Sequence, residues 1–104
     1  MSIKNLSEPV RLKQLAEECA ELGHAALKLA RILRGENPTP VSEAEAREAL
    51  VREIADVMVC TDALTDTRML RDIGSYCTEK KDRWEQRLKQ KQAISINGKT
   101  VLPG

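Results

Sequence analysis

The sequence predicts an all-α protein whose antiparallel helices complete a four-helix bundle through oligomerisation. Two observations carry this prediction: apolar residues recur at helical spacing over two long segments, and helix-ending residues separate these segments. The chain has 104 residues and no phenylalanine, and its only aromatic residues are one tryptophan and one tyrosine, so its core must be aliphatic. A chain of this length forms one modest core, which association with a second copy would help to stabilise.

A first helix is predicted from about Pro9 to Arg34, with Ser7 or Glu8 at its N-cap and Gly35 ending it. Its apolar stripe consists of Leu12, Leu15, Cys19, Leu22, Ala26, Leu29 and Leu33. The segment 35–40 contains one glycine and two prolines, which forbid continuation of the helix and predict a turn-rich connection.

Ser42 and Glu45 form a capping box, which predicts that a second helix opens here and reaches about Leu64. Its stripe consists of Leu50, Ile54, Val57, Met58, Thr61 and Leu64. After a break at residues 65–67, a third helix is expected from Arg68 to about Lys91. The residues expected on its inner side are Leu70, Ile73, Cys77 and Trp84.

The last residues differ in pattern from the rest of the chain. Residues 94–101 alternate around Asn97-Gly98, which is typical of a β-hairpin. An isolated hairpin is only marginally stable, so we expect it to pack on a partner or to fray. The predicted organisation is therefore one helical domain, residues 1–92, followed by a tail or hairpin arm, residues 93–104.

The composition excludes several classes of protein. With 17 basic and 16 acidic residues the net charge is +1, which gives no reason to expect a partner such as nucleic acid or a membrane surface. No segment resembles a signal peptide or a membrane span. The three cysteines are odd in number and share no short metal-ligand spacing, so we expect reduced, largely buried thiols in a cytoplasmic protein.

Two acidic pairs, Glu18/Glu21 and Glu53/Asp56, flank the apolar stripes. A spacing of three places both carboxylates of a pair on one helix face. In an antiparallel hairpin the two pairs lie at similar heights, ~23 Å and ~19 Å from the connection between the helices. Four carboxylates gathered beside a hydrophobic contact repel one another, which favours a divalent-metal site. The alternative interpretation is that they form only a solvated helix face.

These residues, Glu17-Glu18-Cys19-Ala20-Glu21 followed by Glu53-Ile54-Ala55-Asp56, resemble the EExxE and ExxD motifs of the MazG-like superfamily of all-α nucleoside triphosphate pyrophosphohydrolases. The chain looks like the short single-domain members from bacteria and phages, and the resemblance covers roughly residues 10–90. One departure is the long gap of 31 residues between Glu21 and Glu53.

The resemblance implies that Glu18, Glu21, Glu53 and Asp56 are metal ligands and that Glu17 is a catalytic carboxylate that orients water. A set of oxygen ligands suits Mg²⁺, with Mn²⁺ as a substitute, rather than zinc. Family members hydrolyse (deoxy)nucleoside triphosphates to the monophosphate and pyrophosphate. They also form homodimers or dimers of dimers, so we expect a homo-oligomer here.

The substrate contacts are predicted on the third helix and on the first. Lys80, Lys81, Arg83 and Trp84 match the basic-then-aromatic segment that follows the acidic helices in the family. Lysine and arginine can hold phosphate oxygens, and the tryptophan can stack on a base. Lys28 could also reach a phosphate. The alternative interpretation makes the basic residues surface charges and Trp84 a core residue.

Two other functions remain open from the sequence. The phosphoribosyl-ATP pyrophosphohydrolase of histidine synthesis belongs to the same superfamily and shares its acidic motifs. A non-catalytic helical dimerisation module would need no metal at all. A di-iron site is excluded, because His24, which follows Glu21 as ExxH, is the only histidine and such a site needs this motif on two helices.

Overall fold

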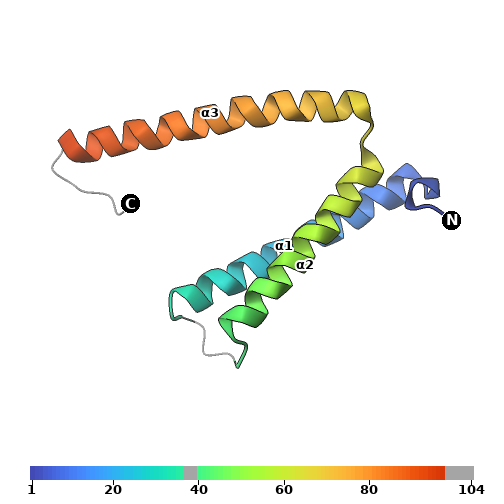
Figure 1. Ribbon diagram of the computed structural model, residues 1–104, viewed down its shortest axis with the longest axis horizontal. Helices are drawn as coiled ribbons and strands as arrows, with labels where there is room; N and C mark the ends of the chain where they lie inside the picture. Colours follow the sequence, from blue (N-terminus) through green and yellow to red (C-terminus); the bar gives the residue numbers. More distant parts are fainter. Residues whose placement is uncertain (37–39, 98–104) are drawn as a thin grey trace. The chain divides into compact units, whose positions relative to one another are not determined.

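Three α-helices make up most of the part of the chain that the structure describes (Figure 1). The computed structural model describes the backbone of residues 1–36 and 40–97 and the side chains of residues 1–36 and 40–93. A short 3₁₀ helix, η1 (Ile3–Asn5), precedes α1 (Glu8–Leu33), α2 (Glu43–Leu64) and α3 (Thr67–Asn97). For the described residues, the prediction of an all-α chain is confirmed.

The chain divides into two units. Met1–Thr65 contains η1, α1 and α2, and the unit that begins at Asp66 contains α3. Within the first unit α1 and α2 pack side by side as an antiparallel hairpin (Figure 1). None of the helices in the described ranges combines the length and the apolar character that a membrane crossing requires.

Local capping fixes the ends of the helices close to where the sequence predicts them. Ser7 occupies the N-cap position of α1, although its side chain forms no capping hydrogen bond; Gly35, with a φ of 71°, takes the left-handed conformation just after the last turn. The capping box that opens α2 is present: the Glu45 amide donates to Ser42 Oγ at 3.1 Å. Asp66 Oδ1 accepts a hydrogen bond from the Met69 amide at 2.9 Å and so caps α3.

The contact between α1 and α2, here called the seam, lies to one side of the predicted apolar stripes. Its buried and part-buried residues form rows with a spacing of seven, as in coiled coils. The rows are Leu15-Leu22-Leu29 and Glu18-Ala25-Ile32 on α1, and Leu50-Val57-Leu64 and Ala46-Glu53-Cys60 on α2. Of the other stripe residues Thr61 is part-buried, and the remaining six are exposed: Leu12, Cys19, Ala26, Leu33, Ile54 and Met58. The seam therefore contains two acidic residues, Glu18 and Glu53, and about half of the residues of the predicted stripes stay exposed.

The side chain of Arg11 forms hydrogen bonds at the end of the hairpin where α1 begins and α2 ends. Its part-buried guanidinium donates from Nε to the Leu6 carbonyl at 3.0 Å and from Nη1 to the Ala63 carbonyl at 2.5 Å. Ala63 lies in the last turn of α2, where helical carbonyls lack partners within the helix and a cation is favourable. This side chain thereby joins the segment before α1 to the C-terminal end of α2.

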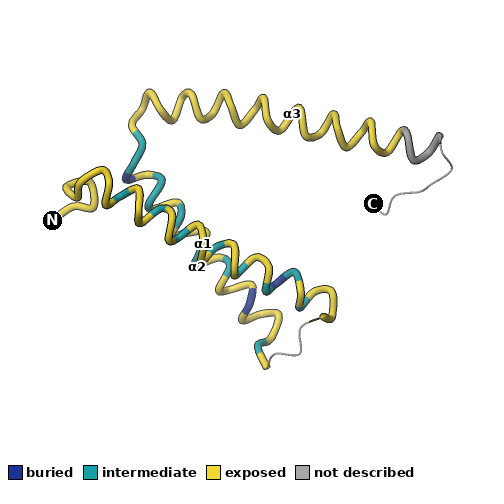
Figure 2. Tube along the Cα trace, turned by 180° about the vertical axis from the view of Figure 1, so that it is seen from behind, coloured by how far each residue is buried: buried dark blue, intermediate teal, exposed yellow. Residues whose placement is uncertain are grey.

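The prediction of largely buried thiols is wrong. Cys19 and Cys77 are exposed, Cys60 is part-buried, and all three are free. Cys19 belongs to the exposed half of the α1 stripe, and Cys77 lies on α3. Figure 2 shows α3 exposed over its described length, and the residues expected on its inner side are all exposed.

Helix α3 is longer than the sequence predicts. It continues through residues 94–97, where the first strand of the hairpin was expected, so that the prediction of a strand is wrong at these positions. Neither glycine nor proline interrupts the chain between Gly74 and Gly98, so the helix has no local reason to stop earlier. Residues 98–104, the remainder of the predicted hairpin, lie outside the described residues. The predicted domain boundary at residue 93 falls inside α3.

Candidate metal site

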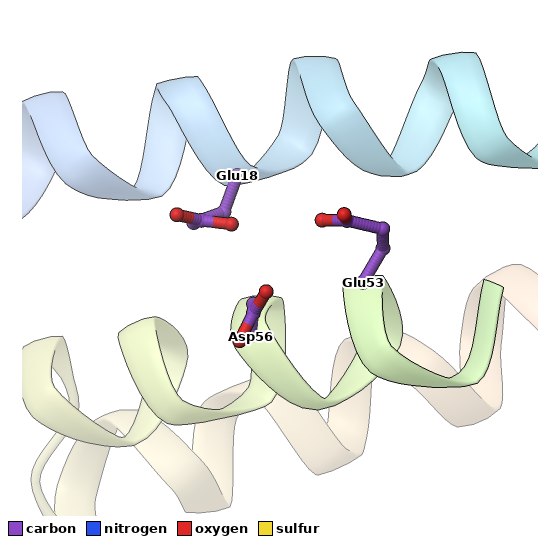
Figure 3. Close-up of side chains that lie close together, drawn as sticks. All are labelled: Glu18, Glu53 and Asp56. Carbon is purple, nitrogen blue, oxygen red and sulfur yellow. The ribbon is translucent and has the colours of Figure 1, made fainter. Parts of the chain in front are cut away.

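Three carboxylates from two helices converge in the seam. One oxygen each of Glu18, Glu53 and Asp56 lies within 4.8 Å of the other two. Figure 3 shows Glu18 pointing from α1 toward α2, and Glu53 and Asp56 pointing from α2 toward α1. The sequence-based expectation that the two acidic pairs face each other is thus met by three of the four residues.

Two of these carboxylates are held away from water because of their place in the heptad rows. Glu18 and Glu53 occupy seam positions and are part-buried, whereas Asp56 is exposed at its edge. Glu18 Oε2 and Glu53 Oε2 are both buried without a hydrogen-bond partner. Leaving a buried carboxylate oxygen without a partner is costly, so the residues fit a bound cation that would satisfy both oxygens.

Burial and neighbouring charge raise the pKa of Glu18, whereas the hydrogen bond from Gln14 lowers it. Burial raises the pKa of the Glu18 carboxyl above its ordinary value of 4.5, and the charges of Glu21 and Asp56 raise it further. Gln14, one turn earlier on α1, donates from Nε2 to Glu18 Oε1 at 2.9 Å, which lowers the pKa. The net effect favours a proton on Glu18, and a nearby divalent cation would reverse that preference.

Glu21 and Glu17 lie outside the three-carboxylate cluster. The charge of Glu21 contributes to the raised pKa of the Glu18 carboxyl. It also lines an open groove together with Glu53. Glu17 is exposed on α1 and lines neither the cluster nor the groove. The predicted ligand role of Glu21 and the catalytic role of Glu17 stay predictions.

The groove lies directly beside the cluster and has a volume of about 530 Å³. Its polar lining comprises Glu21, His24, Lys28, Arg31 and Glu53. Lys28, predicted as a substrate contact, is therefore close to the cluster's own Glu53. His24 and Arg31 were not among the predicted substrate contacts, although their spacing of three and four residues around Lys28 places all three on one face of α1.

The other predicted substrate contacts lie on α3 and belong to the second unit. Lys80, Arg83 and Trp84 are all exposed, Trp84 to 65%. Arg83 forms an ion pair with Glu79, with 3.6 Å between Nη2 and Oε1. Trp84 lines a groove of about 280 Å³ on α3 with Arg87, Leu88 and Lys91.

Two residues at the cluster were not predicted from the sequence as part of the site. Gln14 precedes Glu18 by four positions, the spacing at which helical side chains meet. Cys60 follows Glu53 by seven and lies in the same seam row; burial raises the pKa of its thiol, and the charges of Glu18 and Asp56 raise it further. Cys60 is not among the three residues whose ligand atoms converge.

The donor set consists of carboxylate oxygens, with neither histidine nor cysteine among the three that converge. This chemistry fits a hard divalent cation such as Mg²⁺ or Mn²⁺ better than zinc. Comparison of the chain with protein families, with curated proteins and with solved structures gives no match. Its function must therefore be inferred from the geometry and chemistry of its own residues.

Proposed function

We propose that this chain is a Mg²⁺-dependent enzyme that hydrolyses (deoxy)nucleoside triphosphates to the monophosphate and pyrophosphate. The observation that carries the proposal is the convergence of Glu18, Glu53 and Asp56 from two helices, with two buried carboxylate oxygens that lack a partner. The resemblance of residues 17–21 and 53–56 to the MazG-like motifs supplies the reaction type.

Glu18, Glu53 and Asp56 would hold the cation, with Glu21 at its margin. The chemistry that Mg²⁺, or Mn²⁺ in its place, would supply there is Lewis-acid stabilisation of the charge that develops as the phosphoanhydride breaks. Gln14 keeps one oxygen of Glu18 oriented through its hydrogen bond. The seam limits the access of bulk water to Glu18 and Glu53, which strengthens their electrostatic effect on a bound ligand.

The reaction replaces one P–O bond by another. The oxygen of a water molecule forms a bond to a phosphorus atom flanking the α–β bridge, and the bridging P–O bond breaks. The leaving oxygen keeps the electron pair, and the proton of the water passes to solvent or to a carboxylate. We assign the orientation of that water to Glu17 and the binding of phosphates to Lys28. Phosphate contacts by Lys80 and Arg83 and stacking of Trp84 on the base are implied by the resemblance alone and stay predictions.

A second copy of the chain would complete a four-helix bundle. Only Leu29, Ala46 and Ala63 are buried among the described residues, which is too little for a stable core. When each helix is viewed from its own N-terminus, the exposed residues of its stripe lie on the same side of its seam residues. Because the helices are antiparallel, both halves share one face of the hairpin, and two such faces can cover each other. The proposal is therefore a homodimer or a dimer of dimers.

The experiment is a screen of the common ribo- and deoxynucleoside triphosphates for pyrophosphate release, with and without Mg²⁺. We expect release that requires the metal and that stops with excess chelator. Activity in excess chelator would contradict the proposal. Turnover of phosphoribosyl-ATP alone would favour the alternative enzyme, and weak Mg²⁺ binding without a defined stoichiometry would favour a non-catalytic dimerisation module.

A further inference from the structure

The groove beside the acidic cluster combines two kinds of charge. Glu53 belongs both to the cluster and to the groove, so that the two are continuous. From this shared end the polar lining continues along α1 through His24, Lys28 and Arg31. An acidic end that can hold a divalent cation is thus followed by a row of groups that can donate hydrogen bonds to an anion.

The basic residues of the groove form one row on α1. Lys28 lies ~10 Å and Arg31 ~15 Å along the helix axis from Glu21. Long side chains on a helix extend toward its N-terminus, which directs both of these back toward the acidic end. Their spacing therefore suits an extended anion with several charged groups rather than a compact one.

The two groove cations are not neutralised by the acidic residues beside them. Among the described residues, neither Lys28 nor Arg31 forms an ion pair, although Glu21 and Glu53 line the same groove. Four basic residues on the other helices do pair with a glutamate one turn away: Arg47, Arg52, Lys81 and Arg83. Lys28 is also part-buried, which makes its charge less screened than that of a surface lysine.

We infer that this groove holds the phosphate chain of the substrate, with Lys28 and Arg31 as the residues that bind the phosphates farthest from the acidic cluster. The inference rests on the proposed function, and it specifies the ligand class as a chain of at least two linked phosphates. Arg31 can bind a phosphate with two parallel hydrogen bonds, and Lys28 acts as a point charge on its neighbour.

The test is calorimetric titration of the full-length protein with inorganic tripolyphosphate, in the presence and absence of Mg²⁺. We expect Lys28→Met and Arg31→Gln each to weaken binding about tenfold, because each removes a charge-assisted contact. Lys28→Met keeps the apolar stem that packs in the groove. The matched controls are Lys13→Met on α1 and Arg52→Gln on α2, neither of which lines the groove, and both should stay within about twofold of wild type.

Two further measurements separate phosphate binding from metal binding. Mg²⁺ affinity measured without tripolyphosphate should not fall in Lys28→Met or Arg31→Gln, since no carboxylate is removed. Orthophosphate should bind at least about tenfold more weakly than tripolyphosphate, because it can reach only one of the two cations. Equal affinity for the two anions would overturn the inference of a phosphate chain.

The remaining outcomes distinguish this inference from the proposed function. If no nucleotide is cleaved but both variants weaken tripolyphosphate binding, the groove assignment stands and the proposed reaction falls. If nucleotides are cleaved and both variants keep wild-type kcat/KM and tripolyphosphate affinity, the groove assignment is wrong and the reaction stands. Absence of tripolyphosphate binding to the wild type also overturns it. Circular dichroism checks that each variant folds. If Lys28→Met does not fold, Arg31→Gln, at an exposed position, still tests the inference.

Discussion

The α1–α2 hairpin differs from helix α3 in where it holds part of its charge. On α3, Arg83 pairs with Glu79 and Lys81 with Glu85, one turn apart and exposed. In the hairpin, Glu18 and Glu53 are part-buried, and neither forms an ion pair among the described residues. The hairpin also has exposed pairs, Arg47–Glu43 and Arg52–Glu48, but among the described residues it alone holds charges that are both part-buried and unpaired.

This difference separates helix stabilisation from binding. Exposed pairs at a spacing of four contribute about 0.3–0.5 kcal/mol each and support a helix that buries little. Part-buried carboxylates without partners oppose folding, because their charge is costly to desolvate. A cation that neutralises these carboxylates removes this cost, and the free energy recovered adds to the affinity for the cation. Unpaired, part-buried charge is therefore the better guide to the site in this chain.

The comparison is tested most strongly by two glutamates of α2. Glu53→Ala removes an unpaired seam carboxylate and should lower the rate of pyrophosphate release by at least about a hundredfold, since even changes around metal ligands cost 10- to 100-fold. Glu48→Ala removes an exposed glutamate that pairs with Arg52, and it should stay within about twofold of wild type. Full activity of Glu53→Ala would show that the cluster is only a solvated face.

The uncovered apolar face of the hairpin gives the next largest effect. Met58 is 66% exposed in the single chain and belongs to the α2 stripe. Met58→Glu should raise the dissociation constant of the dimer about 10- to 100-fold, because it buries a carboxylate without a partner. Val59→Glu, on the side of α2 opposite the seam, is the control. Light scattering measures both, and a stable, folded wild-type monomer at micromolar concentration would contradict the proposed dimer.

The third prediction tests whether the basic residues of α3 bind substrate or only stabilise their helix. If Lys80 and Arg83 hold phosphates, Lys80→Ala and Arg83→Ala should each lower kcat/KM about tenfold through the loss of a charge-assisted contact. The Mg²⁺ affinity measured without nucleotide should stay unchanged. Lys89→Ala, on the same helix, serves as the control. Values within about twofold of wild type for both variants would assign these residues to helix stabilisation alone.

The smallest expected effect concerns the stability of the metal-free hairpin. Because the pKa of Glu18 is raised on folding, its proton binds more tightly in the folded state, and stability falls as the pH rises above the ordinary value of 4.5. In chelator at neutral pH, Glu18→Gln should therefore raise Tm, by a few degrees at most. The gain should vanish below pH 4.5 and reverse in saturating Mg²⁺. A lower Tm in chelator at neutral pH would refute this account of Glu18.

Much of the hairpin could be predicted from the sequence. The start of α2 follows from its capping box, and the end of α1 follows from Gly35. The approach of Glu18 to Glu53 and Asp56 follows from matched heights on two antiparallel helices. These features depend on local chemistry and helix geometry, which a single sequence specifies.

The position of the seam could not be predicted in the same way. Periodicity defines the apolar arc of each helix, but it does not say which part of a wide arc meets which partner. The sequence places Glu18 and Glu53 at the edge of the stripes, whereas the structure places both in the seam and leaves Ile54 and Met58 outside it. Likewise Asn97-Gly98 indicates a turn, but α3, which runs through strong helix formers up to Ala93, continues as far as Asn97.

Because two buried oxygens of Glu18 and Glu53 lack hydrogen-bond partners, the melting temperature of the hairpin should report the binding of a cation to them. A cation that binds only the folded hairpin stabilises it in proportion to the logarithm of its concentration, by ~2.7 kcal/mol at a hundred times its dissociation constant. For a domain of this size, 1 kcal/mol corresponds to a shift in Tm of about 4–8 °C. Melting curves recorded across a series of divalent ions would therefore rank the metals this chain prefers before any substrate is known.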